Sequence, residues 1–100
     1  MSKPISYYLS GSPPFPLESI ERLQPADQIN LGCNMLELAC SKDIHPDRVI
    51  ATMNAIAFAA KCSIETINDI PPDRMVRLAA AILMVATDDL ELLQPKNLIV

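Results

Sequence analysis

The sequence is poor in aromatic residues and in glycine, and it contains no tryptophan. Of its 100 residues, 4% are aromatic and two are glycine. So few aromatic rings leave little surface on which bases or sugars could stack. The chain also has no glycine-rich loop of the kind that cradles phosphate groups. These shortages count against proteins that recognise nucleotides or sugars.

An excess of positive charge and long apolar runs are missing as well. Twelve acidic residues outnumber eight basic ones, and the net charge of −4 differs from the basic face usual in nucleic-acid-binding proteins. The longest uninterrupted apolar run, residues 78–86, is far shorter than the roughly 20 residues that span a membrane. The N-terminal sequence lacks the continuous apolar core of a secretory signal. We therefore expect a cytoplasmic protein that binds neither nucleic acid nor membrane.

The three cysteines show no paired spacing. Cys33 and Cys40 would share one face of a helix but lie roughly 10 Å apart along its axis, too far for a disulfide. We predict that these two and Cys62 are small buried hydrophobic residues. The alternative is a metal site that joins them to the single histidine, His45, although no paired ligand spacing supports it. We expect no metal and no cofactor.

Half of the residues are apolar, mean hydropathy is +0.22, and three similar helix starts organise the chain. Pro25, Pro46 and Pro72 each stand where a first helical residue belongs, and an aspartate follows in the positive first turn. These starts predict three main helices, over residues 25–40, 46–61 and 72–86. The fold class that follows is all-α: a small orthogonal bundle of three main helices plus one or two short helices.

Shorter segments are predicted from capping residues. Ser63 can cap a short helix through Ile67. Asp88 and Glu91 resemble a capping box, which predicts a separate last turn over residues 90–93. Residues 17–23 are either a turn of helix or an extended lead-in, and residues 41–43 are predicted to form a turn.

The first 16 residues contain four prolines and are predicted to form an extended arm. Within the arm, residues 5–9 are a candidate short strand because Tyr7 and Tyr8 favour one. The arm either packs on the domain or reaches a partner. The expected organisation is a Pro-rich arm over residues 1–16, a helical domain over 17–93 and a tail over 94–100.

Residues 78–86 are apolar on every side of the predicted helix, whereas a surface helix normally has one polar face. A chain of this size buries only about 60–65% of the surface that its unfolded form exposes. The helix is therefore either central in the bundle or presents one face to another molecule. We predict a protein partner, expected to be an apolar helix, with homo-oligomerisation as a further alternative. The candidate partner-binding residues are Met75, Leu78, Ala80, Ala81, Leu83, Met84 and Phe58.

No catalytic constellation is present. The chain has no nucleophile elbow, and His45 has only Asp43 and Asp47 nearby in sequence to orient it. We therefore predict a non-enzymatic protein and name no catalytic residue. Residues 58–70 imitate a helix-turn-helix, but Glu65 and Asp69 on the second helix would repel phosphate. An ordinary helical corner is the favoured interpretation, and a DNA-associated regulator is the disfavoured one.

The order of features resembles one protein family. The lead-in PLESIERLQPADQINLG (residues 16–32), the corner AFAAKCSIETINDI (residues 57–70) and a last apolar helix that begins at Pro72-Asp73 are similar to the small tail assembly chaperones of Mu-like and P2-like tailed phages. The family's corner usually carries glycine where Cys62 stands. The resemblance implies binding of the tail tape-measure protein during assembly in the host cytoplasm, without catalysis.

The apolar surplus and the resemblance thus support one hypothesis, a helical protein–protein interaction module that acts as a phage tail assembly chaperone on a tape-measure-like helix. The alternative is a structural subunit of a larger complex, with the arm and the apolar tail Leu98-Ile99-Val100 as tethers.

Overall fold

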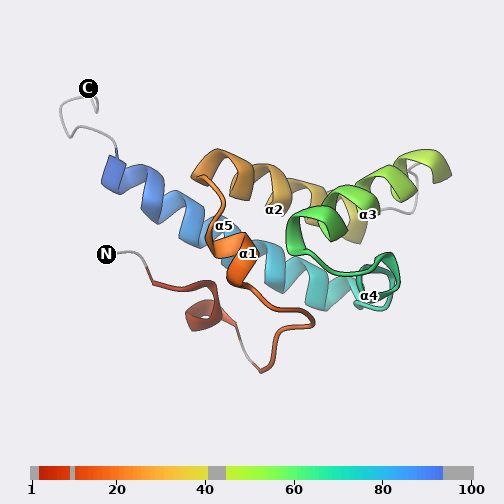
Figure 1. Cartoon of the computed structure of the whole chain (residues 1–100), viewed down its shortest axis with the longest axis horizontal. Helices are drawn as coiled ribbons and strands as arrows, with labels where there is room; N and C mark the ends of the chain where they lie inside the picture. Colours follow the sequence, from red (N-terminus) through yellow and green to blue (C-terminus); the bar gives the residue numbers. More distant parts are fainter. Residues whose placement is uncertain (1–2, 10, 41–44, 94–100) are drawn as a thin grey trace.

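The computed structural model describes residues 3–9, 11–40 and 45–93, and it places side chains as far as Asp88. A short 3-10 helix, η1 (Ile5–Tyr8), precedes five α-helices: α1 (Glu18–Glu21), α2 (Pro25–Ala39), α3 (Pro46–Ala60), α4 (Ile64–Asn68) and α5 (Pro72–Leu93) (Figure 1). No strand occurs within the described residues. The predicted all-α bundle of three main helices with additional short ones is confirmed.

The helix starts follow the capping rules that the sequence predicted. α2, α3 and α5 begin at Pro25, Pro46 and Pro72, each with an aspartate in its first turn. His45 caps α3 because its Nδ1 accepts a hydrogen bond from the backbone N–H of Asp47 at 3.2 Å. The hydroxyl of Ser63 caps α4 in the same way, by accepting from the N–H of Thr66 at 3.2 Å.

The C-terminal end of α3 turns through a left-handed residue. Lys61 has φ 56° and ψ 46°, and the N–H of Cys62 reaches back to the carbonyl of Ala57 at 3.1 Å. This is a Schellman arrangement, in which glycine is the usual residue at the left-handed position. The corner into α4 is therefore tight, and Lys61 rather than Cys62 has the unusual backbone.

The core lies where α2 and α5 pack along each other, with α3 and α4 closing one end (Figure 1). Leu31 and Met35 of α2 meet Leu78 and Ile82 of α5 within one cluster of buried side chains. A glycine permits the close approach of these two helices, since a Cβ at Gly32 would come 2.7 Å from Leu83. α5 therefore buries most of its apolar run against α2 and the arm, while Ala80 and Met84 remain exposed, so the helix is not enclosed on every side.

The arm packs on the domain. Ile5 and Phe15 are buried in the core, and the Tyr8 hydroxyl donates to Asp88 Oδ2 on α5 at 3.0 Å. Arg74 of α5 donates to the backbone carbonyl of Ser12. Of the two alternatives left open by the sequence, the structure thus supports packing on the domain.

The predicted strand over residues 5–9 is wrong, because η1 occupies this segment. The N–H of Tyr7 bonds to the carbonyl of Pro4 at 3.0 Å, and the N–H of Leu9 bonds to the carbonyl of Ser6 at 3.2 Å. Local bonds satisfy the backbone where no neighbouring strand is present to pair with it. For residues 17–23, the predicted turn of helix is confirmed as α1.

The separate last turn predicted over residues 90–93 is also wrong, because α5 continues without a break to Leu93. Thr87, the first polar residue after the apolar run, keeps its hydroxyl within the helix by donating to the carbonyl of Leu83 at 2.8 Å. Asp88 does not act as a cap, and its carboxylate accepts the Tyr8 hydroxyl.

The cysteine prediction fails for Cys33 and Cys40, which are exposed, whereas Cys62 is half-buried. α2 turns Gln28, Leu31, Gly32 and Met35 toward the core. Cys33 follows Gly32 by about 100° around the helix and therefore points away from α5. The predicted turn over residues 41–43 and the tail over 94–100 lie outside the described residues.

Candidate functional site

The predicted partner-binding residues separate by burial. The side chains of Met75, Leu78 and Ala81 are buried, and Leu83 is half-buried against Gly32. Ala80 is exposed and Met84 is 50% exposed. Most of the apolar run in α5 therefore forms the centre of the bundle, and only one edge of it reaches the surface.

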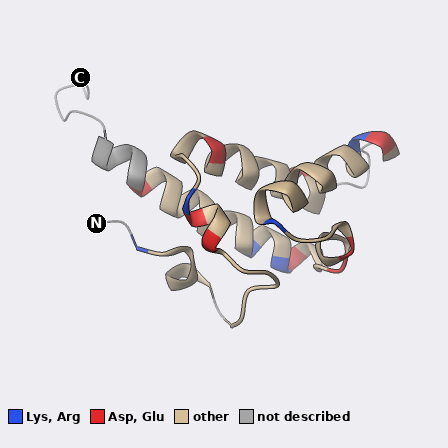
Figure 2. Cartoon of the chain, viewed as in Figure 1, with Lys and Arg blue, Asp and Glu red and all other residues tan. Residues whose placement is uncertain are grey.

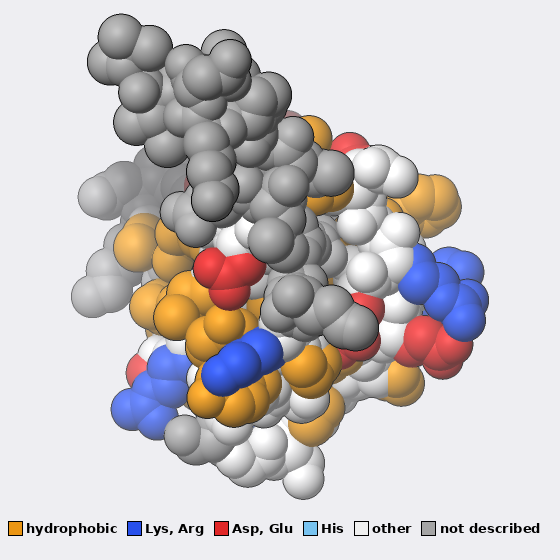
Figure 3. All heavy atoms as spheres, turned by 90° about the vertical axis from the view of Figure 1, so that its left-hand side faces the viewer, with side chains coloured by type: hydrophobic (Ala, Val, Ile, Leu, Met, Phe, Trp, Pro, Cys, Tyr) orange, Lys and Arg blue, Asp and Glu red, His pale blue; other side chains and the backbone are white. Residues whose placement is uncertain are grey.

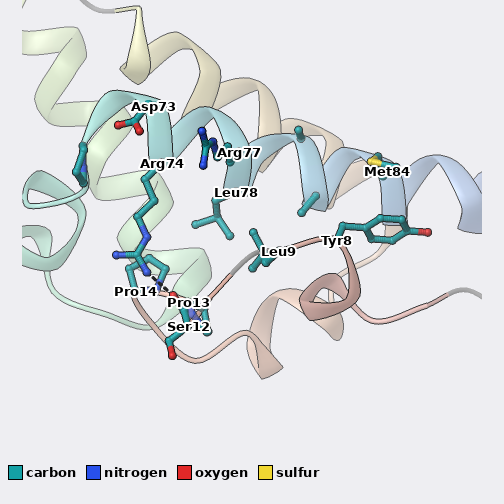
Figure 4. A pocket seen from close by; sticks show the side chains of 13 residues that line it. Tyr8, Leu9, Ser12, Pro13, Pro14, Asp73, Arg74, Arg77, Leu78 and Met84 are labelled. Carbon is teal, nitrogen blue, oxygen red and sulfur yellow. Dashed lines mark hydrogen bonds between the residues drawn. The ribbon is translucent and has the colours of Figure 1, made fainter.

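That edge borders a groove of about 380 Å³ between α5 and the arm, which we call the arm groove (Figure 4). In the close view Leu78 and Leu9 point toward each other from the two walls, and Met84 lies above Tyr8. Its lining residues are Tyr8, Leu9, Ser12, Pro13, Pro14, Pro71, Asp73, Arg74, Arg77, Leu78, Ala80, Ala81 and Met84. Four of the seven predicted residues (Leu78, Ala80, Ala81 and Met84) therefore come together here, whereas Met75, Leu83 and Phe58 do not line it.

The two ends of the arm groove differ in charge. At the N-terminal end of α5, Arg74 is held by the Ser12 carbonyl, while Arg77 forms no ion pair with any described residue. At the other end, Tyr8 donates to Asp88, and this hydrogen bond, aided by desolvation, raises the pKa of the Tyr8 phenol. The groove thus has an apolar floor, with Asp73, Arg74 and Arg77 at one end and the hydrogen-bonded Tyr8–Asp88 pair at the other.

Aromatic and basic groups extend the arm's surface beyond the groove. The rings of Tyr7 and Tyr8 meet edge to face at a centroid distance of 5.1 Å, and Lys3 Nζ lies 3.9 Å from the centroid of the Tyr7 ring. The hydrogen bond with Lys3 lowers the pKa of Tyr7. Figure 3 shows hydrophobic side chains gathered on this side of the molecule, with charged groups around them.

A second apolar surface lies on α3. We call it the α3 outer face, and it consists of Asp47, Ile50, Ala51, Asn54, Ala55 and Phe58, all of them exposed. Phe58 is 85% exposed and Ile50 is 53% exposed. Charged residues mark the two ends of α3, and none lies between Arg48 and Lys61 (Figure 2). Phe58, the predicted residue remote from α5, belongs to this face.

The sequence patterns did not point to Ile50 or to the groove-lining residues of the arm. Ile50 could have been found from its spacing, because it precedes Phe58 by eight residues and such positions share one side of a helix. The arm residues Leu9, Pro13 and Pro14 carry no periodic pattern. Their position opposite α5 depends on the burial of Ile5 and Phe15 on either side of them.

Within the described residues, no three histidine, cysteine, aspartate or glutamate side chains converge as metal ligands would. The helices in the same part of the chain include none with the length and hydropathy needed to cross a membrane.

No protein-family model, curated protein or solved structure matches this chain. The functional assignment therefore depends on the chain's own surfaces.

Proposed function

We propose that this protein is a non-enzymatic interaction module that holds an apolar helix of a partner protein in the arm groove. The observation that carries the proposal is the groove itself, an opening of about 380 Å³ beside α5 in which the exposed Ala80 and Met84 lie next to the buried Leu78 and Ala81. Contiguous apolar surface open to solvent commonly marks a binding site.

The chemistry of the groove suits the anchor side chains of a helix. Amphipathic helices dock by placing a few apolar anchor side chains in a groove of the partner. Met84 is flexible and half-exposed, so it can adapt to anchors of different shape. Arg77, at one end, can pair with a carboxylate on the polar side of the same helix.

The resemblance to tail assembly chaperones of tailed phages gives the partner an identity within this proposal. The partner would be a helix of the tape-measure protein, which the module would shield in the host cytoplasm until the tail assembles. An open, adaptable apolar groove suits that task, because the client helix is long and hydrophobic and many anchors along it must fit the same groove.

The test uses synthetic apolar helices of about 20 residues taken from tape-measure proteins of tailed phages, a length at which isolated helices become stable. Fluorescence anisotropy measures their affinity for the wild-type protein and for two variants. Met84→Glu places a charge in the groove and is expected to weaken binding by at least about tenfold. Val76→Glu, on the same helix but outside the groove and 40% exposed, is the matched control and should bind normally.

Two results would contradict the proposal. Failure of the whole panel to bind the wild-type protein would exclude the tape-measure role. Binding that Met84→Glu leaves unchanged would place the ligand outside the arm groove.

A further inference from the structure

We propose that the α3 outer face binds the same face of a second copy of this chain, with the two α3 helices antiparallel across a two-fold axis. This surface lies outside the arm groove, so the inference goes beyond the proposed function and is independent of it.

The α3 outer face has no partner among the described residues. α3 packs on α1, α2 and α4 through its opposite side, where Thr52, Ile56 and Ala60 are buried. Its outer side leaves Phe58 and Ile50 largely in water. A buried aromatic residue at the centre of well-packed contacts is the usual energetic anchor of an interface, and Phe58 is available for that role.

Two pairs of residues lie at equal distances from Asn54 along the chain. Ile50 and Phe58 lie four residues before and after it, and Asp47 and Lys61 lie seven residues before and after it. In an antiparallel pair centred on Asn54, residues equidistant from the centre come opposite each other. Phe58 of one copy then lies against Ile50 of the other, and the two Asn54 amides meet at the axis, where each can donate to the other.

Charge selects the antiparallel orientation. The Asp47 side chain is 90% exposed, and its nearest charged or titratable partner is His45, whose Nδ1 lies 3.7 Å from Oδ2. Lys61 forms no ion pair with any described residue. An antiparallel pair brings Asp47 of each copy next to Lys61 of the other, whereas a parallel pair would place like charges together.

The face also supplies both parts of a packed contact. Phe58 and Ile50 are the projecting side chains, and Ala51 and Ala55 leave room beside them for close approach of the partner helix. The α3 outer face thus carries projections and recesses, with an amide at its centre that can pair with its own copy. Asp47 at one end and Lys61 just beyond the other end supply opposite charges. These properties fit a second copy of the chain, since a two-fold contact must be complementary to itself.

The first experiment measures molecular mass as a function of protein concentration, by sedimentation equilibrium. The wild-type protein should show a reversible monomer–dimer equilibrium. Phe58→Glu should raise the dissociation constant by at least about 100-fold, as loss of a central aromatic anchor does. Because Phe58 is 85% exposed, this substitution should leave the fold intact, as circular dichroism can verify. The control Val76→Glu should dimerise like the wild type.

A charge swap tests the orientation. Asp47→Lys and Lys61→Asp each place like charges opposite one another, so each alone should weaken the dimer. The double variant restores opposite charges and should recover affinity to within about fivefold of the wild type. Aspartate is suitable at position 61 because it tolerates the left-handed backbone there. If each single variant weakens the dimer but the double variant does not recover its affinity, the pairing of Asp47 with Lys61 is excluded.

A disulfide tests the position of the axis. With Cys33, Cys40 and Cys62 replaced by serine, Asn54→Cys should form a disulfide-linked dimer on mild oxidation, because residues at a two-fold axis face their own copies. Glu65→Cys, exposed on α4, should not form such a dimer.

A wild-type chain that stays monomeric at all concentrations, or a dimer unaffected by Phe58→Glu, would overturn the proposal. Peptide binding in the arm groove should survive Phe58→Glu, so failures of the two proposals can be distinguished.

Discussion

The Leu83 side chain lies directly over Gly32, where α2 and α5 come closest. A Cβ added at Gly32 would stand 2.7 Å from both Cγ and Cδ2 of Leu83. Cγ is close to the α5 backbone and cannot swing aside as a side-chain end can. Leu83, one of the predicted partner-binding residues, is therefore committed to the contact between the two main helices.

Gly32→Ala is expected to lower the free energy of unfolding by about 1 kcal/mol. Overpacking costs about 1–3 kcal/mol, and the better helix propensity of alanine offsets about 1 kcal/mol of this. Denaturant unfolding of both single variants and of Gly32→Ala combined with Leu83→Ala measures the effect. The double variant should lose less free energy of unfolding than the sum of the losses in the two single variants. Simple additivity, or a Gly32→Ala protein more stable than the wild type, would show that the contact is loose.

The α1–α2 junction depends on Gln28, which is buried. Its Nε2 donates to the carbonyl of Ile20 at 3.0 Å, and no described donor reaches its Oε1. Gln28→Leu should cost less than about 1 kcal/mol, because the Ile20 carbonyl still accepts the N–H of Leu23 and the unsatisfied oxygen disappears. Gln28→Glu keeps the shape and can still donate as the neutral acid, but on ionisation it loses the donor and places a carboxylate in the core.

Stability of the Gln28→Glu variant should depend on pH. Burial favours the neutral acid, so the folded-state pKa of the new carboxyl rises above its unfolded value of about 4.3. Its destabilisation should therefore grow as pH rises from about 4 toward 7, by about 2–3 kcal/mol relative to Gln28→Leu. Unfolding curves of both variants across this range test the prediction, and parallel pH profiles would refute it.

The contact of Tyr8 with Asp88 should be lost at alkaline pH. The pKa of Tyr8 is raised because the phenol donates to the carboxylate. A group whose pKa is higher in the folded state stabilises that state fully below its unfolded pKa, here about 10, and stops doing so as pH rises through the folded value. The arm should therefore loosen above about pH 10.

Absorbance of tyrosinate can follow this titration. Tyr7 has a lowered pKa and ionises first, so a Tyr7→Phe background isolates Tyr8. In that background the phenol should titrate above its ordinary range, and Asp88→Ala should return it toward that range. An unchanged midpoint after Asp88→Ala would mean that the hydrogen bond is not maintained in solution.

Lys61→Gly should stabilise the fold by about 0.5–1 kcal/mol. Lys61 is the one non-glycine residue with positive φ among the described residues, and glycine adopts this conformation without steric cost. Thermal unfolding of dilute protein provides the measurement. A lower midpoint for Lys61→Gly would show that side-chain contacts of Lys61 outweigh its backbone strain.

Local chemistry allowed much of the fold to be predicted. Pro25, Pro46, Pro72 and Ser63 determine where helices begin, because each acts through its own backbone or through a residue close by. The wrong predictions concern residues whose structure depends on contacts with segments far away in the sequence. In the sequence Asp88 resembles a helix cap, but in the structure its carboxylate accepts a hydrogen bond from the Tyr8 hydroxyl. Tyr7 and Tyr8 favour a strand, but no described strand lies beside them to pair with.

The candidate site was only partly predictable for the same reason. Apolar composition indicated that residues 78–86 could not all lie on the surface, but it could not distinguish the buried Ala81 from the exposed Ala80. That difference depends on which side of α5 the arm and α2 cover. Phe58 was identifiable because an aromatic residue in an uncharged segment is conspicuous, whereas its neighbour Ile50 required knowledge of the exposed side of α3.

The bond from Tyr8 to Asp88 joins residues that are 80 positions apart. During synthesis, the arm leaves the ribosome long before α5, which it packs against. Ile5 and Phe15 have their full set of core neighbours only once α5 has emerged, so the nascent chain must hold these side chains in water or in transient contacts until then. The core should therefore form only after α5 has been synthesised, with closure of the arm among the last events of folding.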